Sequence, residues 1–101
     1  MIKHIVFWKL KEGAHGQSDE ANANEIKRLL ESLNGKIESI EKLEVGFNFV
    51  ENSNAFDVAL YSEFKSKADL DAYQVHSLHV AAKVFIGEAT SDRKVVDYEI
   101  S

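Results

Sequence analysis

The segment Ile2–Leu10 constrains the fold more than any other part of the chain. In an extended strand the side chains alternate between two faces, and here both sets are largely apolar. One face would carry Ile2, His4, Val6, Trp8 and Leu10, and the other would carry Ile5 and Phe7. Both faces of such a strand must be covered, so the sheet that contains it needs a packing layer on each side.

The rest of the sequence divides into segments with helix or strand periodicity. Ser18 and residues 21–33 show helical spacing that stops at Asn34-Gly35. Residues 43–50 and 56–64 alternate as strands on either side of a polar turn at 52–54, which favours an antiparallel pair. A helical turn over 67–73 precedes a helix over 76–87, and residues 94–100 form the last expected strand. The order βαββαβ predicts an α+β, ferredoxin-like sandwich with both helices on one face of an antiparallel sheet.

The helix-free face of that sheet would expose more apolar area than a monomer normally shows, because Ile5 and Phe7 lie on it. Residues 1–101 fit one domain, and a chain of 101 residues has only a thin core of its own. A second sheet packed on the same face would cover it, and a symmetric homodimer supplies one. We therefore expect the protein to pair with itself.

Composition excludes several classes of protein. The chain has no cysteine, so neither a disulfide framework nor a thiolate nucleophile is available. A net charge of −5 without any run of Lys or Arg disfavours nucleic acid and anionic membrane as partners. The apolar runs are too short to span a bilayer, and we expect a cytoplasmic protein. No phosphate loop, nucleophile elbow or paired-carboxylate motif is present, and no cofactor is expected.

Residues 72–82 concentrate the side chains that can do chemistry, because Tyr73, His76 and His79 fall within seven residues. If Ser77 caps a helix that begins at Leu78, His79 lies in its first turn. The positive end of the helix dipole would then lower the pKa of His79 and keep the imidazole neutral at pH 7. His76 and His79 share a helical face, but a zinc site needs three or four ligands and the spacing supplies no third. We predict no metal.

Several motifs together resemble a known family, the stress-responsive dimeric α/β-barrel proteins, over nearly the whole chain. The most specific is His76-Ser77-Leu78-His79-Val80, in which serine stands where the family usually has proline. The others are Lys3-His4-Ile5-Val6-Phe7, Gly46-Phe47-Asn48, and Phe64-Lys65-Ser66 followed by Asp69-Leu70 and Tyr73. The resemblance implies that two protomers pair their sheets into a barrel, and that each keeps a pocket between its own sheet and helices.

The resemblance also implies candidate site residues. A minority of such proteins, like the plant polyketide cyclase olivetolic acid cyclase, close a linear polyketide without a cofactor. They use a histidine and a tyrosine that fall on His79 and Tyr73 here, and a pocket histidine falls on His4. From the residues themselves, His4 shares an apolar face with Trp8 and needs a partner or must stay neutral. We expect Trp8, Phe47 and His76 to contribute to the same substrate-binding pocket.

Three classes of function remain open from the sequence. The first is a small stress-response homodimer whose pocket binds an apolar or aromatic metabolite. The second is a cofactor-independent lyase, cyclase or isomerase in which His79 removes a proton and Tyr73 donates to the developing enolate oxygen, or less closely a cofactor-independent monooxygenase. The third is a purely structural barrel that stacks into larger rings. An open cavity that reaches His79 favours the first two, and a cavity filled by Phe and Trp side chains favours the third.

Overall fold

One antiparallel sheet organises the computed structural model, which describes residues 1–101. Its strands lie in the order β2-β3-β1-β4, with bounds β1 Ile2–Leu10, β2 Lys42–Phe47, β3 Val58–Phe64 and β4 Thr90–Glu99. The first strand is therefore central, and the last strand forms one edge. This arrangement confirms the ferredoxin-like α+β fold that the order of periodicities predicts.

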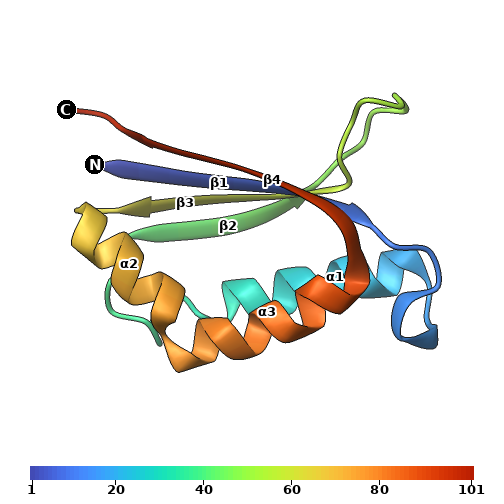
Figure 1. Ribbon diagram of the computed structural model, residues 1–101, viewed down its shortest axis with the longest axis horizontal. Coiled ribbons are helices and arrows are strands. Elements are labelled where there is room, and N and C mark those ends of the chain that lie inside the picture. Colours follow the sequence, from blue (N-terminus) through green and yellow to red (C-terminus); the bar gives the residue numbers. More distant parts are fainter.

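The helices cover a single face of the sheet, as Figure 1 shows. They are α1 (Asp19–Glu31), α2 (Lys67–Val75) and α3 (Ser77–Ala89), and a short 3₁₀ turn η1 (Ala14–Gly16) precedes α1. The Ser18 hydroxyl caps α1 by accepting from the Ala21 backbone N–H at 3.1 Å, and Ser66 caps α2 in the same way through Asp69 at 3.1 Å. None of the helices is both long enough and apolar enough to cross a membrane.

The two faces of β1 meet different surroundings, as its alternation predicts. Ile2, Val6 and Trp8 are buried under the helices. In contrast, Ile5 is half-buried and Phe7 is 39% exposed on the helix-free face. The core beneath the sheet combines apolar side chains of β1, β2 and β3 with those of the helices, including Ile26, Leu30, Leu60, Phe64 and Ile86. Strand β4 is exposed and adds little to it.

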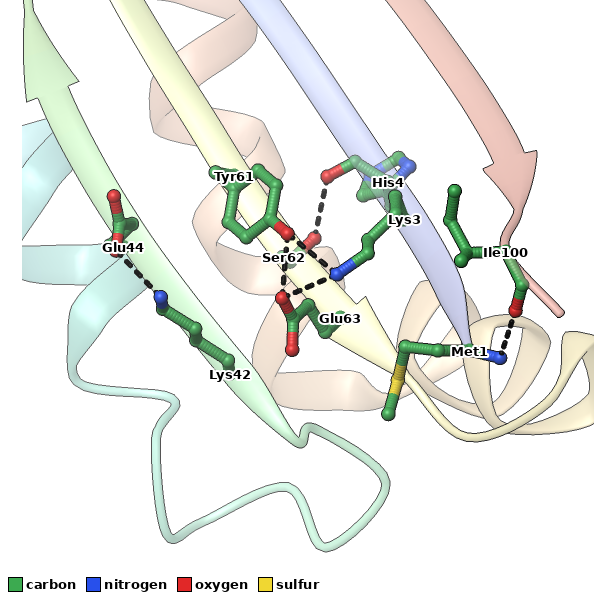
Figure 2. Close-up of polar contacts among 9 residues, drawn as sticks. All are labelled: Met1, Lys3, His4, Lys42, Glu44, Tyr61, Ser62, Glu63 and Ile100. Atoms are coloured by element: carbon green, nitrogen blue, oxygen red, sulfur yellow. Dashed lines mark hydrogen bonds and ion pairs between the residues drawn. The ribbon is translucent and has the colours of Figure 1, made fainter.

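The helix-free face has an apolar centre beside a charged cluster. Ile5 pairs with Tyr61 on β3 and with Val96 on β4. Next to them Lys3 donates to the Tyr61 hydroxyl at 2.8 Å and to Glu63 at 2.7 Å, and Figure 2 shows these three side chains together. This face carries no helix, so its apolar part is unpaired within one chain.

Two strand boundaries differ from the expected ones by more than two residues, for local reasons. Strand β2 ends at Phe47 instead of continuing to Val50, because the Asn48 side chain accepts from the Val50 N–H and donates to its carbonyl, which turns the backbone out of the ladder. Phe49 is consequently 94% exposed. Strand β4 begins at Thr90, ahead of the expected 94, because its charged early residues occupy an exposed edge strand that needs no apolar alternation.

The start of β1 lies beside the end of the edge strand β4. The Met1 ammonium donates to the Ile100 carbonyl at 2.9 Å, and Figure 2 shows this contact next to β1 and β4. The register pairs Trp8 with Arg93, Val6 with Val95 and His4 with Asp97. Residues paired directly across an antiparallel ladder share a face, so these β4 side chains lie on the helix side of the sheet.

Candidate functional site

A cavity of about 380 Å³ lies between the β1–β4 side of the sheet and α3. Its apolar lining is Val6, Trp8, Leu30, Leu60, Ile86 and Val95. Its polar lining is His4, Gln74, His79, Lys83, Thr90, Arg93 and Asp97, together with Gly87. A cavity that combines apolar side chains with convergent polar groups is a usual setting for a small-molecule site.

His79 and Tyr73 form an aromatic pair at this cavity. Their rings stack with centroids 4.1 Å apart and an interplanar angle of 30°. His79 is 8% exposed and lines the cavity, whereas Tyr73 is fully buried behind it. The Tyr73 hydroxyl has no hydrogen-bond partner in the chain, although buried hydroxyls are normally paired.

Burial is the main reason why the pKa of His79 falls from 6.5 to about 4. The hydrogen bond to the Gln74 carbonyl opposes this decrease, and the charges of Lys83, His4 and Arg93 add to it. The imidazole is thus neutral at pH 7, as expected, although burial outweighs the helix dipole as the cause. A carbonyl can only accept, so Nδ1 of His79 is the donor in the 3.4 Å contact with Gln74, and Nε2 keeps the lone pair.

The same burial raises the pKa of the Tyr73 hydroxyl above its ordinary value, and the charge of Arg93 opposes the increase. Tyr73 is therefore a neutral phenol in the free protein. A neutral phenol can donate a proton or a hydrogen bond, and the neutral imidazole beside it can accept one. The pair has the complementary protonation states that general acid–base chemistry requires.

His4 completes a row of rings beneath the cavity. Its ring centroid lies 6.1 Å from that of Tyr73, and the imidazole is 2% exposed. Its Nδ1 donates a hydrogen bond to the Asp97 carboxylate. A carboxylate accepts only, so this bond fixes the orientation of the ring and leaves Nε2 as the second functional nitrogen. The partner that a buried His4 requires is thus Asp97, across the β1–β4 ladder.

The structure brings most of the expected site residues together. His4, Trp8 and His79 line the cavity, and Tyr73 supports it from behind. Phe47 does not line it, because β2 is the opposite edge of the sheet from β4; its ring lies 42% exposed, with the Lys27 ammonium 5.8 Å from its centroid.

His76 also lies outside the cavity. It caps helix α3, a role that the sequence predicts for Ser77. Helix α3 begins at Ser77, so the expected cap at Ser77 is wrong. His76 is the capping residue, and its Nδ1 accepts from the Leu78 backbone N–H at 3.1 Å. A ring nitrogen replaces the usual side-chain oxygen in satisfying a free N–H of the first turn.

Sequence reasoning missed Asp97, Gln74, Lys83 and Arg93 as cavity residues. The signal for Asp97 was available, because Arg93, Val95 and Asp97 alternate along the last strand and an antiparallel partner places them opposite alternate residues of β1. Lys83 and Arg93 have no comparable signal, since an isolated cation in a helix or edge strand usually marks a solvated surface. No group of three or more His, Asp or Glu side chains is arranged to hold a metal ion.

Comparisons with known proteins concern the family and the fold. The family model described as Stress responsive A/B Barrel Domain matches residues 2–100. A dimeric protein of unknown function and ferredoxin-like fold from Bacteroides fragilis is 37% identical, with 98% of this chain and 95% of that chain covered and a TM-score of 0.87. A search of the curated proteins found no match.

Two more distant structures share the fold. The hydroxynitrile lyase from Passiflora edulis is 19% identical, with 99% of this chain and 93% of that chain covered and a TM-score of 0.83. An antibiotic biosynthesis monooxygenase is 16% identical, with 100% and 99% covered and a TM-score of 0.73. At these identities the likeness concerns the architecture alone.

Proposed function

The chain belongs to the stress responsive A/B barrel domain family, and from this premise we propose that it is a homodimer that binds a small apolar or aromatic metabolite between its sheet and helices. The observation that carries the proposal is the cavity itself, which reaches both His79 and His4. A volume of about 380 Å³ is at the lower end of the range for ligand pockets, which favours a small molecule.

Self-association is supported by the helix-free face. Phe7 and Val96 are 39% and 53% exposed there, beside the half-buried Ile5. A second copy can cover this face with the same surface, as two-fold symmetry requires. The 37% identical Bacteroides fragilis protein is described as dimeric. Sheet-to-sheet pairing leaves the cavity free, because the cavity lies on the opposite, helix-covered side.

Ligand binding can be tested with Trp8, which is the only tryptophan of the chain and lines the cavity. Nitroaromatic compounds quench tryptophan, so titration with neutral 4-nitrobenzamide should quench Trp8 with saturation. The variant Gly87→Leu fills the cavity, since a Cβ at Gly87 meets open space and the backbone there is unstrained. We expect it to weaken binding about tenfold or more, at a cost of about 1.4 kcal/mol.

The matched control is Ala81→Leu, which adds similar bulk on an exposed position of the same helix. Ala81→Leu should bind the probe as the wild type does. If the probe does not quench Trp8, or if both leucine variants bind equally well, the cavity is not a ligand site.

A second candidate, a cofactor-independent proton-transfer enzyme, is favoured by the neutral His79 stacked on Tyr73. Nε2 of His79 would remove a proton next to a carbonyl. The unpartnered Tyr73 hydroxyl, which lies behind the cavity lining, would donate to the enolate oxygen after a local rearrangement that brings the two together. This chemistry would serve a cyclase, a lyase or an isomerase. A purely structural barrel is less well supported than either candidate, because the cavity reaches His79.

The reaction class can be tested without knowledge of the natural substrate. Benzoylacetone carries an aromatic ring and an acidic carbon between two carbonyls, and enzyme-dependent deuterium exchange at that carbon reports proton abstraction. His79→Ala should lower the exchange rate by ~10²–10⁴-fold while probe affinity stays nearly unchanged. Tyr73→Phe should reduce the rate less. Exchange that is independent of His79 would remove this candidate and leave ligand binding as the function.

A further inference from the structure

We infer that Lys83 and Arg93 form an anion-selective rim on the cavity, and that the ligand is a small carboxylate with an apolar or aromatic body. This inference rests on the proposed ligand-binding function and specifies the chemical class of the ligand. Lys83 comes from α3 and Arg93 from β4, and both line the cavity. The two cations thus approach the same space from the helix layer and from the sheet.

Neither cation is neutralised by a neighbouring side chain. The ion pairs of the chain involve Lys3, His4, Lys27, Arg28, Lys42 and Lys65, and none includes Lys83 or Arg93. The one carboxylate that lines the cavity, Asp97, accepts from His4. In a chain with a net charge of −5, a cavity with two unpaired cations and one engaged carboxylate is an exception to the overall charge.

The charges of the rim reach the buried groups of the site. Both Lys83 and Arg93 lower the pKa of His79, and Arg93 acts on the pKa of Tyr73 in the same direction. A positive field of this kind disfavours a second cation and favours a negative group on the ligand. The same field would also stabilise negative charge that develops on a ligand oxygen near Tyr73.

The surroundings favour a carboxylate over a phosphate. Phosphate sites commonly use free backbone N–H groups at a helix N-terminus or in a glycine-rich loop. Here the N-terminus of α3 is capped by His76, and the cavity lining includes Gly87 as its only glycine, inside the helix. The guanidinium of Arg93 offers a planar fork that binds carboxylate and phosphate alike, and Lys83 adds a point charge, so the preference for carboxylate rests on the lack of free backbone N–H groups. The apolar lining from Val6, Trp8 and Ile86 then suits the body of the molecule.

The test compares three 4-nitrophenyl compounds that quench Trp8 but differ in charge. These are 4-nitrobenzoate, its neutral counterpart 4-nitrobenzamide, and 4-nitrophenyl phosphate. In the wild-type protein we expect the benzoate to bind about tenfold or more tightly than the amide, as charge-assisted hydrogen bonds predict. The variants Lys83→Gln and Arg93→Gln should each reduce this preference, and the double variant should abolish it, with the affinity for the amide measured in each variant as the reference.

The control variant Lys36→Gln removes one positive charge from an exposed turn outside the cavity and should preserve the preference. Equal binding of benzoate and amide by the wild type would overturn the anion rim but leave the proposed cavity function intact. A preference that survives in the double variant would also overturn it. Tighter binding of the phosphate than of the benzoate would refute the carboxylate assignment. If no compound quenches Trp8, the cavity function fails and the rim fails with it.

Discussion

Lowering the pH from 7 to 5 should destabilise the protein, and the contribution of His79 can be calculated by itself. In the unfolded chain the imidazole takes up a proton near pH 6.5, whereas in the folded protein its pKa is about 4. Between these values the unfolded state binds more protons, so the free energy of unfolding decreases as the pH falls. With these two pKa values, the linkage relation gives a loss of about 2 kcal/mol between pH 7 and pH 5. That is a large fraction of the stability of a small domain.

The measurement is urea unfolding at pH 7, 6 and 5 at one fixed protein concentration, since pairing of two copies would make the stability depend on concentration. The comparison is with His79→Phe, which keeps an aromatic ring against Tyr73 but cannot take up a proton. The wild type should lose about 2 kcal/mol more than this variant over the interval. The carboxylates with lowered pKa, Glu25, Glu31 and Glu63, lose their contribution only as the pH falls through and below their ordinary value of 4.5, and they are present in both proteins.

The reasoning is refuted if His79→Phe shows the same pH dependence as the wild type. Such a result would mean that the imidazole remains solvated enough to take up a proton in the folded state. The proton-transfer candidate would lose its neutral base at the same time.

Other parts of the structure support separate predictions. Phe7→Asp should convert the proposed homodimer to monomer in sedimentation experiments at micromolar concentration, because a desolvated, unpaired carboxylate costs several kcal/mol per chain. The control Val84→Asp, at a 62% exposed position of α3, should leave the dimer intact. Equal behaviour of the two variants would contradict the interface. Tyr73→Phe should keep or raise the free energy of unfolding and the melting temperature, since the lost hydroxyl has no partner. A decrease of more than about 1 kcal/mol in the free energy of unfolding would show that the hydroxyl makes a hydrogen bond. His76→Ala should cost about 1 kcal/mol in urea unfolding through the lost cap, and His76→Asn should recover most of it; equal losses would show that the ring does not cap α3.

The fold was accessible from the sequence because it depends on periodicity. The alternation of Ile2–Leu10 distinguishes a covered central strand from a half-exposed one, and the structure places β1 in the centre of the sheet. Helix positions followed from apolar spacing and from the Ser18 cap. Boundaries at Asn48 and Ser77 were wrong because side-chain hydrogen bonds within two residues decide them, and such bonds leave no periodic trace.

The candidate site was only partly accessible. His4 and His79 are noticeable in sequence because imidazoles interrupt apolar patterns. Phe47 was misplaced because alternation gives the face of a strand but not its distance from a cavity across the sheet, and β2 is two strands away from β1. Asp97, Lys83 and Arg93 look like ordinary surface charges until the pairing of β1 with β4 and the position of α3 are known.

The central position of β1 determines the order in which the protein can fold. This strand is made first, yet its neighbours β3 and β4 come from the second half of the chain. The bond between His4 and Asp97 spans 93 residues. Pairings of such long separation require closure of a large loop before they return any free energy, which slows folding. During synthesis, both edges of β1 therefore stay unpaired until β3 is made, and its second edge stays unpaired until β4 has left the ribosome. We expect the nascent chain to depend on protection from aggregation over this interval, and the cavity to be the last feature to form.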